Sequence, residues 1–382
     1  MTEDKASAAS EPAQTLSDRD DPVSPTTGAP SGGDTPAEPP LLVPGREVHG
    51  FAFHADPKEY FRIWIVNTLL TLLTLGLFAA WAKVRKRRYL RGNTEFMGHR
   101  FDYRADPRRI LVGNLLVAVV FVAYMVFGEV YQAIRIGAVI VGVILLPWIV
   151  VRSLAFNAAN TTYRGFRFYY HESIGMAALV YLGQILVIVV TLGLYYPAWV
   201  RNRKEFSIAN HQLGDAFFRF SAKNGPFYSA YFIGGLVLTG ASIAGGFGTA
   251  LVLRGTGHKV ADLMDLLPFL ALYGTAFHLT KQYIYARLFN HVWNHTKLDE
   301  HRFMASLDAG RWLKLQLVNL GAIVLSCGLL YPWAVIRSSR YALSCLVLEL
   351  ATPLERIRRL GRGEGSALGE TAGEFIGLDV GL

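Results

Sequence analysis

The chain has 382 residues, of which 52% are hydrophobic and 18% are charged, and its formal net charge is +9. Several apolar runs approach 20 residues, the length that spans the ~30 Å hydrocarbon core of a bilayer, so the composition indicates an integral membrane protein. The basic residues gather at the ends of the apolar runs, as the positive-inside rule requires, which argues against nucleic acid as a partner.

Three regions differ in composition along the chain. Residues 1–44 are rich in small, polar and acidic residues and in proline, and they are predicted to be a disordered tail. Residues 45–350 are predicted to be the membrane domain, and residues 351–382, charged and then glycine-rich, a flexible C-terminal tail.

Seven apolar segments occupy the predicted membrane domain. Only helices and closed barrels satisfy the backbone in lipid, and no alternating ten-residue pattern favours a membrane-spanning barrel. The sequence therefore predicts an all-α polytopic membrane protein with about seven helical segments. They are residues 60–82, 110–128, 134–151, 174–200, 226–253, 266–284 and 312–336.

One signature is written three times, at Asn67–Tyr89, Gln184–Phe206 and Asn319–Tyr341. Each copy begins with a side-chain amide, has a hydroxyl seven residues on and a glycine two further, and ends with a tryptophan and basic residues. This pattern predicts an internal duplication, in which signature segments 60–82, 174–200 and 312–336 alternate with helix pairs at 110–151 and 226–284.

The connectors also resemble one another. Asn93–Tyr103 and Asn160–Tyr170 share the pattern Asn-x-x-x-x-Gly followed by alternating aromatic and polar residues, and Asn210–Phe220 and Asn294–Met304 are looser copies. The pattern is typical of a turn and a short strand, so short β-hairpins or strands are expected on the cytoplasmic side.

The distribution of basic residues conflicts with seven full crossings. Four connectors, between segments 1–2, 3–4, 4–5 and 6–7, are basic, and the positive-inside rule places them all in the cytoplasm. Seven crossings would place some of them outside. Either the three signature segments are re-entrant or broken near their glycine, or they span and one basic loop lies outside.

Polar residues inside the apolar segments are the first set of candidate site residues. Each amide shares a helix face with the hydroxyl seven residues on, so the three pairs are predicted either to line a polar path or to form interhelical hydrogen bonds. Two ionisable residues of the sixth segment join them, although the lysine has the length to reach the interface. The set is Asn67, Thr74, Gln184, Thr191, Asn319, Ser326, His278 and Lys281.

The recurring spacing Trp-x-x-x-Arg gives a second set of candidates. Tryptophan favours the headgroup level and an arginine one turn further meets phosphates, so these pairs are predicted to be interfacial anchors or a ring of arginines at the mouth of an anion path. The pairs are Trp81/Arg85, Trp148/Arg152, Trp199/Arg203 and Trp333/Arg337. Anionic lipid headgroups are the expected partner.

No catalytic residues, cofactor or metal site are predicted. The sequence lacks a phosphate-binding loop, a GxSxG motif and an acidic metal motif, so an enzyme is the minority interpretation. His291 and His295 have the spacing of a helical metal pair, but no HExxH glutamate lies between them. Cys327 and Cys345 lie in or beside an apolar segment and are predicted to be apolar fillers.

The combination of Thr-Leu-Gly-Leu, a tryptophan, an arginine-rich turn and Asn-Thr-x-x-x-Gly in Glu59–Tyr103 resembles the YjgN family of bacterial inner-membrane proteins. The resemblance continues through Thr191–Phe220 and Leu329–Tyr341, and the last copy departs from it at Ser326 and Cys327. It implies a multi-pass protein of the bacterial cytoplasmic membrane and brings no substrate. Two functions are carried forward: a transporter or channel with a polar site at membrane depth, and a non-transporting scaffold or sensor that binds lipid or a partner through its basic cytoplasmic face.

Overall fold

The computed structural model describes residues 46–128, 132–171, 173–256 and 263–357. The protein divides into two units, Met1–Leu41 and Leu42–Leu382, and every described residue belongs to the second. The predicted N-terminal tail lies outside the described residues, as does the predicted C-terminal tail beyond residue 357.

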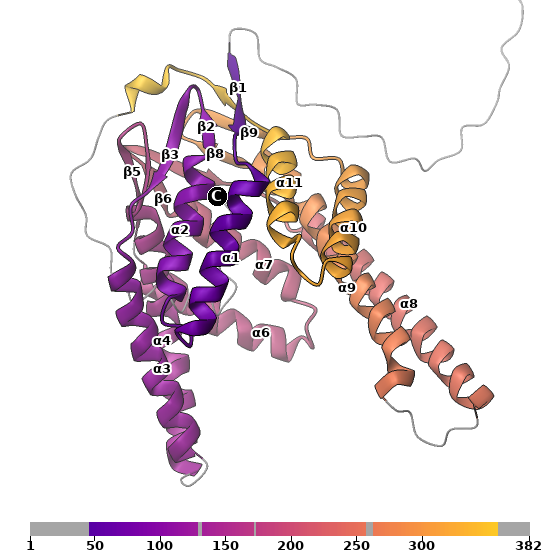
Figure 1. The fold of residues 1–382 in the computed structure, drawn as a ribbon. Helices are drawn as coiled ribbons and strands as arrows, with labels where there is room; N and C mark the ends of the chain where they lie inside the picture. Colours follow the sequence, from indigo (N-terminus) through magenta and orange to yellow (C-terminus); the bar gives the residue numbers. More distant parts are fainter. Residues whose placement is uncertain (1–45, 129–131, 172, 257–262, 358–382) are drawn as a thin grey trace, which may run out of the picture. The chain divides into compact units, whose positions relative to one another are not determined.

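Ten short antiparallel strands close into a barrel, from which the helices lead away (Figure 1). Neighbours pair in the order β1-β10-β9-β8-β7-β6-β5-β4-β3-β2, so the first and last strands complete the ring. The strands are β1 (Glu47–Phe53), β2 (Thr94–Phe96), β3 (His99–Tyr103), β4 (Thr161–Tyr163), β5 (Phe166–Tyr170), β6 (His211–Leu213), β7 (Ala216–Phe220), β8 (Thr296–Leu298), β9 (His301–Ala305) and β10 (Leu346–Leu350).

The helices occur in pairs between the strands. Two pairs are long: α3 (Pro107–Gly128) with α4 (Gln132–Ala159), and α8 (Gly225–Thr256) with α9 (Leu263–Asn294). Three are short: α1 (Pro57–Leu73) with α2 (Ala79–Gly92), α5 (Ile174–Ala178), η1 (Leu179–Gly183) and α6 (Gln184–Val190) with α7 (Tyr196–Ala209), and α10 (Ala309–Leu325) with α11 (Tyr331–Ser344). The 3-10 turn η2 (Leu354–Arg356) follows β10.

One order of elements, strand–helix–helix–strand, therefore occurs five times along the described residues. Each helix pair leaves the barrel at the end of one strand and returns to the start of the next. The last strand of one unit forms a hairpin with the first strand of the following unit, and β1 and β10 make the fifth pairing in register from Glu47 with Leu350 to Gly50 with Val347.

The connector motif forms tight hairpin turns. In the β2–β3 turn Met97 has φ 47° and Gly98 has φ 73°, and in the β4–β5 turn Arg164 and Gly165 have φ 50° and 79°. Two successive residues with positive φ form the type I′ turn, whose twist matches that of paired strands. The glycine of Asn-x-x-x-x-Gly occupies the second of these positions.

The barrel interior is packed with apolar side chains. Phe96, Leu213 and Leu298 are buried there, and the stacked rings of Phe218 and Phe303 have centroids 6.2 Å apart. Leu354, just after the last strand, packs against the same cluster. Over these residues the barrel is a filled core rather than a water-filled lumen.

The expected fold class is wrong. The protein is not all-α with about seven spanning segments, because the connector peptides pair with one another into a closed barrel. Periodicity reveals individual strands but not their pairing over long sequence separations. Among the described residues, two helical stretches are long and apolar enough to cross a membrane, Arg135–Ala159 and Gly225–Gly255.

The signature segments are each divided by a reversal of the chain. The segment predicted at 60–82 comprises most of α1 and the start of α2, and the segments at 174–200 and 312–336 are divided in the same way. Helices of adjacent units then pack side by side: α2 against α3, α4 against α5, α7 against α8, α9 against α10, and α11 against α1. The ring of units is thus closed by helices as well as by strands.

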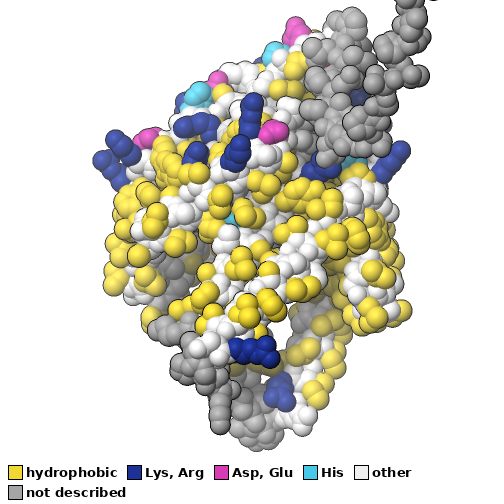
Figure 2. All heavy atoms as spheres, turned by 90° about the vertical axis from the view of Figure 1, so that its right-hand side faces the viewer, with side chains coloured by type: hydrophobic (Ala, Val, Ile, Leu, Met, Phe, Trp, Pro, Cys, Tyr) yellow, Lys and Arg dark blue, Asp and Glu magenta, His cyan; other side chains and the backbone are white. Residues whose placement is uncertain are grey.

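The helices expose large apolar side chains on their outer faces. Leu75 is 96% exposed, Leu192 93% and Leu325 89%, and all three lie at or beside the chain reversals. Figure 2 shows hydrophobic side chains spread over the helices, while charged side chains of both signs gather at the barrel end and further basic side chains lie at the opposite end. An exposed apolar band between two charged ends is what a bilayer covers.

Candidate functional site

The three short helix pairs reverse through one backbone geometry. At the first reversal Leu75 has φ 51° and Gly76 has φ 92°, and the Gly76 N–H donates to the Thr71 carbonyl oxygen at 2.7 Å. The Leu75 N–H donates to Leu72 at 3.2 Å, which completes the Schellman ending of a helix. The reversals at Leu192–Gly193 and Cys327–Gly328 repeat both bonds.

The signature hydroxyl connects the two helices across each reversal. Thr74 donates to the Leu70 carbonyl at 2.7 Å and accepts from the Phe78 N–H at 2.9 Å. Thr191 accepts from Tyr195 at 3.2 Å, and Ser326 accepts from Leu330 at 2.9 Å. Each hydroxyl therefore satisfies a backbone N–H that the break in the helix leaves without a helical partner.

The signature amide bonds to the second helix of its own pair. The Asn67 Nδ2 donates to the Ala82 carbonyl at 3.4 Å, and the Asn319 Nδ2 donates to Ala334 at 3.5 Å and to Ser338 Oγ at 3.0 Å. These contacts do not join the three amides to one another. They correspond to the interhelical hydrogen bonds that the sequence analysis left open beside a polar path.

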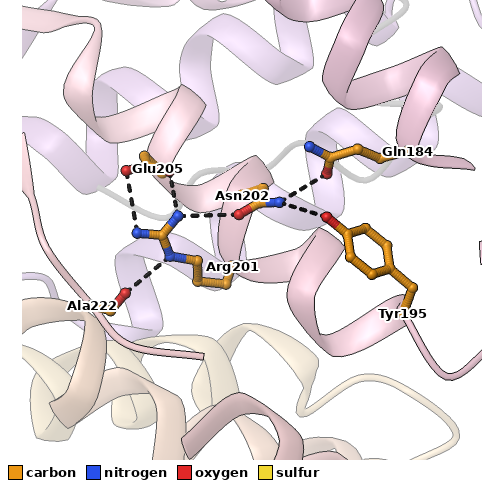
Figure 3. Close-up of polar contacts among 6 residues, drawn as sticks. All are labelled: Gln184, Tyr195, Arg201, Asn202, Glu205 and Ala222. Atoms are coloured by element: carbon orange, nitrogen blue, oxygen red, sulfur yellow. Dashed lines mark hydrogen bonds and ion pairs between the residues drawn. The ribbon is translucent and has the colours of Figure 1, made fainter. Parts of the chain in front are cut away.

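The pair α6–α7 carries a longer polar network (Figure 3). The Asn202 Nδ2 donates to Gln184 Oε1 at 3.1 Å and to the Tyr195 hydroxyl at 3.2 Å, and its Oδ1 accepts from Arg201. Arg201 pairs with Glu205 through both terminal nitrogens and donates from Nε to the Ala222 carbonyl at 2.9 Å. The network links the amide in α6 to the linker between β7 and α8 in the next unit.

The Trp-x-x-x-Arg pairs form cation–π stacks on the second helices. The guanidinium carbon of Arg203 lies 4.8 Å from the Trp199 ring centroid, that of Arg337 5.0 Å from Trp333, and that of Arg152 6.0 Å from Trp148. Trp81 and Arg85 have the same spacing on α2, where Arg85 is exposed. All four pairs lie on the helix that returns to the barrel.

The sequence analysis missed a related pair on α9. Tyr283 and Arg287 lie 135 residues after Trp148 and Arg152, the same shift that relates other positions of the second and fourth units. Arg287 is exposed. With this pair, every second helix carries an aromatic residue and an arginine one turn later. The signal in the sequence is the alignment of α4 with α9, in which a tyrosine replaces the tryptophan.

The backbone bond that closes each unit was also missed. The carbonyl after the second helix accepts from the N–H after the first strand of the same unit, at 2.9 or 3.0 Å in all five units. The carbonyls belong to Asn93, Asn160, Asn210, His295 and Cys345, here called the neck residues. Asn93, Asn160 and Asn210 also donate from their side chains to the carbonyl four residues back. The signal in the sequence was the recurring asparagine.

The two ionisable candidates of α9 behave differently. Lys281 is exposed, which agrees with a side chain that reaches toward the interface. His278 is half-buried, and its Nε2 has no hydrogen-bond partner in the described part of the chain. Within the described residues, neither side chain forms a hydrogen bond with the three amides.

The histidine pair at the end of α9 is engaged by backbone carbonyls. The His291 Nε2 lies 3.0 Å from the Lys223 carbonyl oxygen and the His295 Nδ1 lies 2.8 Å from that of His291. Among the described residues, no group of three or more histidine, cysteine or carboxylate side chains could hold a metal ion.

A family model described as "Bacterial protein of unknown function (DUF898)" matches residues 48–375, most of the chain. The chain belongs to this family. Relatives named "Inner membrane protein YjgN" include one from Escherichia coli strain K12, 33% identical over 132 residues, and one from Salmonella typhimurium strain LT2, 25% identical over 344 residues. These relatives confirm the resemblance drawn from the signature motifs.

The extent of these matches differs. The alignment with the Escherichia coli K12 relative covers 33% of this chain and 32% of that protein, so the chain spans about a third of its length there. The Salmonella relative is matched over 75% of this chain and 84% of its own length. No solved structure matches. The comparisons support the bacterial inner membrane as the location of this chain and name no substrate.

Proposed function

We propose that this protein is a multi-pass scaffold of the inner membrane that holds anionic lipid headgroups around its cytoplasmic barrel and does not transport a solute. The observation that carries the proposal is the set of arginine–tryptophan stacks on the returning helices. Its partner is an anionic phospholipid.

The position of each stack between tip and barrel favours headgroup binding. On α11 the chain runs from the apolar tip at Leu329, 50% exposed, through Trp333 and Arg337 to the neck residue Cys345. Tryptophan prefers the headgroup level, and an arginine one turn closer to the barrel meets the phosphates. Stacking on the indole holds the guanidinium in place at the level where phosphates lie.

Helix length supports a topology in which every connector lies in the cytoplasm. The 14 residues of α2 and of α11 extend about 21 Å at 1.5 Å per residue, less than the ~30 Å hydrocarbon core. The 32 residues of α8 and of α9 extend about 48 Å. The long pairs cross and return, and the short pairs enter and turn back at their glycine, so all five units begin and end on the basic side.

An internal duplication accounts for this plan. The three short reversals share their positive-φ pair, their hydroxyl contact and their backbone bonds, and the strand–helix–helix–strand order recurs along the chain. Five copies of one unit, three with short and two with long helix pairs, explain why the sequence motifs recur at two different spacings.

Transport by a polar path is the second candidate, and one observation favours it. Asn67 and Asn319 are 7% and 2% exposed, and the Oδ1 atom of each has no partner in the described part of the chain. Such an oxygen accepts a hydrogen bond from water or a solute at membrane depth at little cost. The scaffold is preferred because the Nδ2 atoms of both amides already hold their own helix pairs together.

Lipid selectivity tests the proposal. The wild-type chain in mixed bilayers is expected to immobilise spin-labelled phosphatidylglycerol in preference to phosphatidylcholine, measured by electron spin resonance. The triple change Arg152→Gln, Arg203→Gln and Arg337→Gln should remove the preference, since each arginine near the surface contributes about 1 kcal/mol. The matched control alters three exposed arginines on the outer wall of the barrel, Arg100→Gln, Arg219→Gln and Arg302→Gln, and should keep it.

A second triple separates the two candidates. Asn67→Leu, Gln184→Leu and Asn319→Leu should lower the unfolding temperature and leave the lipid preference intact if the protein is a scaffold. Loss of a solute flux with lipid preference unchanged would establish transport instead. If the arginine triple variant keeps a preference for phosphatidylglycerol as strong as that of the wild type, the scaffold proposal is overturned.

A further inference from the structure

Three positive side chains form a row across the outer wall of the barrel. Arg219 of β7 is directly opposite Lys297 of β8, and Lys297 is directly opposite Arg302 of β9. An adjacent residue of each strand belongs to the buried apolar core, so alternation directs the three cations outward, and all three are exposed. At a strand separation of about 4.8 Å this cationic row is about 10 Å long.

The cationic row brings like charges together without a counter-charge. Residues of like charge that lie directly opposite each other destabilise a pair of strands, and the row contains two such contacts. Around β2 and β3 the charges are balanced, since Arg100 lies 3.9 Å from Glu95 and Arg104 lies 2.6 Å from Asp102. In the described part of the chain, no ion pair includes a cation of the row.

The carboxylates that adjoin the row are engaged by other groups. Glu349 of β10 is directly opposite Arg302, but it is 2% exposed and its Oε2 accepts from Arg46 at 3.4 Å. The Oδ1 of Asp299, in the β8–β9 turn, accepts from the Phe217 N–H at 3.2 Å. The positive charge of the row is therefore left for the anionic oxygen atoms of another molecule.

Exposed apolar side chains lie on the same wall. Phe217 of β7 points outward two residues before Arg219, is 43% exposed, and stacks on the His171 ring with centroids 5.3 Å apart. Val48 of β1, directly opposite Glu349, is 39% exposed. Arginine and aromatic side chains are enriched where proteins bind one another, so this wall has the character of a protein interface.

The row lies beyond the headgroup level in the proposed topology. Arg203, at the level of the lipid phosphates, precedes the neck residue Asn210 by seven residues, about 10 Å of helix. Lys297 lies on the other side of the neck, two residues after His295. A bilayer whose phosphates meet the arginine–tryptophan stacks thus leaves the row in water, where a soluble partner reaches it.

We infer that the cationic row binds an acidic segment of a second, cytoplasmic protein. Carboxylates of that segment form charge-assisted hydrogen bonds with the three cations and relieve the repulsion among them, and its apolar residues contact Phe217. A nucleic acid fits less well, because its continuous line of phosphates would pass close to Asp299 and Glu300 in the adjoining turn. The inference requires the barrel to lie outside the bilayer and does not require the protein to select lipids.

Fluorescence anisotropy of a labelled acidic peptide tests the inference. The probe is a fluorescein-labelled peptide of eight glutamates, added at low salt to the full chain in an uncharged detergent. Wild type is expected to bind it saturably, and the row variant should bind about tenfold more weakly or less, because charge-assisted contacts are lost. The row variant is Arg219→Gln, Lys297→Gln and Arg302→Gln.

A matched control separates the row from the net charge of the protein. It removes three exposed positive charges elsewhere and should bind the peptide as wild type does. The control variant is Arg100→Gln, Arg104→Gln and Arg108→Gln. If wild type does not bind saturably, or if the two triple variants bind the peptide equally, the inference is overturned.

A charge reversal shows that any loss of binding is not a loss of folding. Lys297→Glu replaces two repulsive contacts across the strands with two attractive ones, so it should raise the unfolding temperature while it weakens peptide binding. A Lys297→Glu protein that binds the peptide as tightly as wild type would contradict the assignment of this surface.

Two further ligands identify the class of partner. A single-stranded oligonucleotide with the net charge of the peptide should bind more weakly than the peptide. Equal or tighter binding that the row variant loses would assign the row to nucleic acid instead. Phosphatidylglycerol vesicles should not compete with the peptide, and competition that the row variant abolishes would assign the row to lipid. The lipid preference that tests the scaffold proposal is a separate readout, so either proposal can fail alone.

Discussion

At the scale of single residues, the position after the neck residue is threonine in three units, histidine in β6 and leucine, Leu346, in β10. The first residue of β2, β4 and β8 is a threonine whose hydroxyl donates to the carbonyl four residues back, at 3.0, 2.7 and 2.8 Å. In β6 the same position is His211, whose Nδ1 lies 2.5 Å from the Ser207 carbonyl oxygen. The imidazole replaces the hydroxyl as a helix-ending donor and adds a titratable group.

The titration of His211 predicts a pH dependence of stability. The pKa of His211 is lowered from 6.5 to about 4, first by burial and then by the Arg91 charge. Between these values the unfolded chain binds a proton that the folded chain does not, so the free energy of unfolding falls as pH decreases from 6.5 toward 4. Above pH 6.5 the imidazole is neutral in both the folded and the unfolded chain, so this loss of stability is absent.

The variant His211→Thr should remove this dependence while keeping the capping bond. Unfolding temperatures of both proteins in one detergent are measured from pH 7.5 to pH 4.5. The wild type should lose more stability than the variant over this range, and any difference isolates His211 because the other histidines are common to both. Parallel curves would show that burial does not perturb this imidazole.

At the scale of elements, the geometry of the short reversals accounts for the hydroxyl and the glycine in Thr-Leu-Gly-Leu at the first two and in Ser-Cys-Gly-Leu at the third. A Schellman ending needs a left-handed residue and usually places glycine there, yet Leu75, Leu192 and Cys327 occupy that position with φ near 50°. A non-glycine residue in this conformation costs roughly 1–2 kcal/mol. Under the proposed topology its side chain enters lipid, and the hydrophobic free energy gained there offsets the cost. Leu192 is 93% exposed, so its side chain is open to lipid under the proposed topology.

The native cysteine Cys327 reports where these tips lie. It is exposed at the reversal between α10 and α11. A spin label on Cys327, in a protein with Cys345→Ala, should be accessible to oxygen and shielded from a charged nickel chelate, as expected for a label inside the hydrocarbon. The aqueous control is a label attached through the substitution Asp215→Cys at the β6–β7 turn. Chelate accessibility equal at the two sites would overturn the re-entrant topology.

Part of this element-level picture was predictable from the sequence. Charge placement favoured a break near the signature glycine, and the paired helix faces of Asn67 and Thr74 indicated polar contacts between helices. The number of strands and their closure were not predictable, because each strand has three to seven residues and its partner is specified by tertiary packing. The sequence of one short strand, taken alone, does not distinguish it from an irregular connector.

The candidate site was predictable to a similar degree. Regular spacing identified the Trp-x-x-x-Arg pairs, since both residues lie on one helix. The same reasoning could not find Arg91 beside Thr161 and near His211, because these residues come from three units and meet only when the ring forms. Nothing in the sequence around Arg91 distinguishes it from the interfacial basic residues that precede it.

At the scale of the whole molecule, the ring closes between residues from the two ends of the described chain. β1 pairs with β10, and the Arg46 Nη1 donates to Glu349 Oε2 at 3.4 Å across 303 residues. The Arg340 Nη2 donates to the Ala55 carbonyl at 2.9 Å, joining the last helix to the first linker. The side chain of Glu349 is 2% exposed and that of Arg46 is 30% exposed.

The ion pair between Arg46 and Glu349 is predicted to contribute to the free energy of unfolding. Arg46→Ala leaves the buried Glu349 carboxylate without its cation and should lower the free energy of unfolding by about 1–3 kcal/mol. The double variant Arg46→Ala, Glu349→Gln should recover part of the loss, because a neutral amide costs less to bury than a charge. Detergent-based chemical denaturation of the four proteins of the cycle gives the coupling. A coupling near zero would show that the pair does not stabilise the closure.

The pairing of β1 with β10 also determines when the barrel can close during synthesis. A ribosome makes the first strand early and the last strand at the end, so one edge of β1 stays unpaired while all five helix pairs are synthesised. The barrel is complete only once Leu350 has left the exit tunnel. Until then the nascent chain is an open arc, and its two free edges are where a chaperone, or a neighbouring nascent copy, would bind.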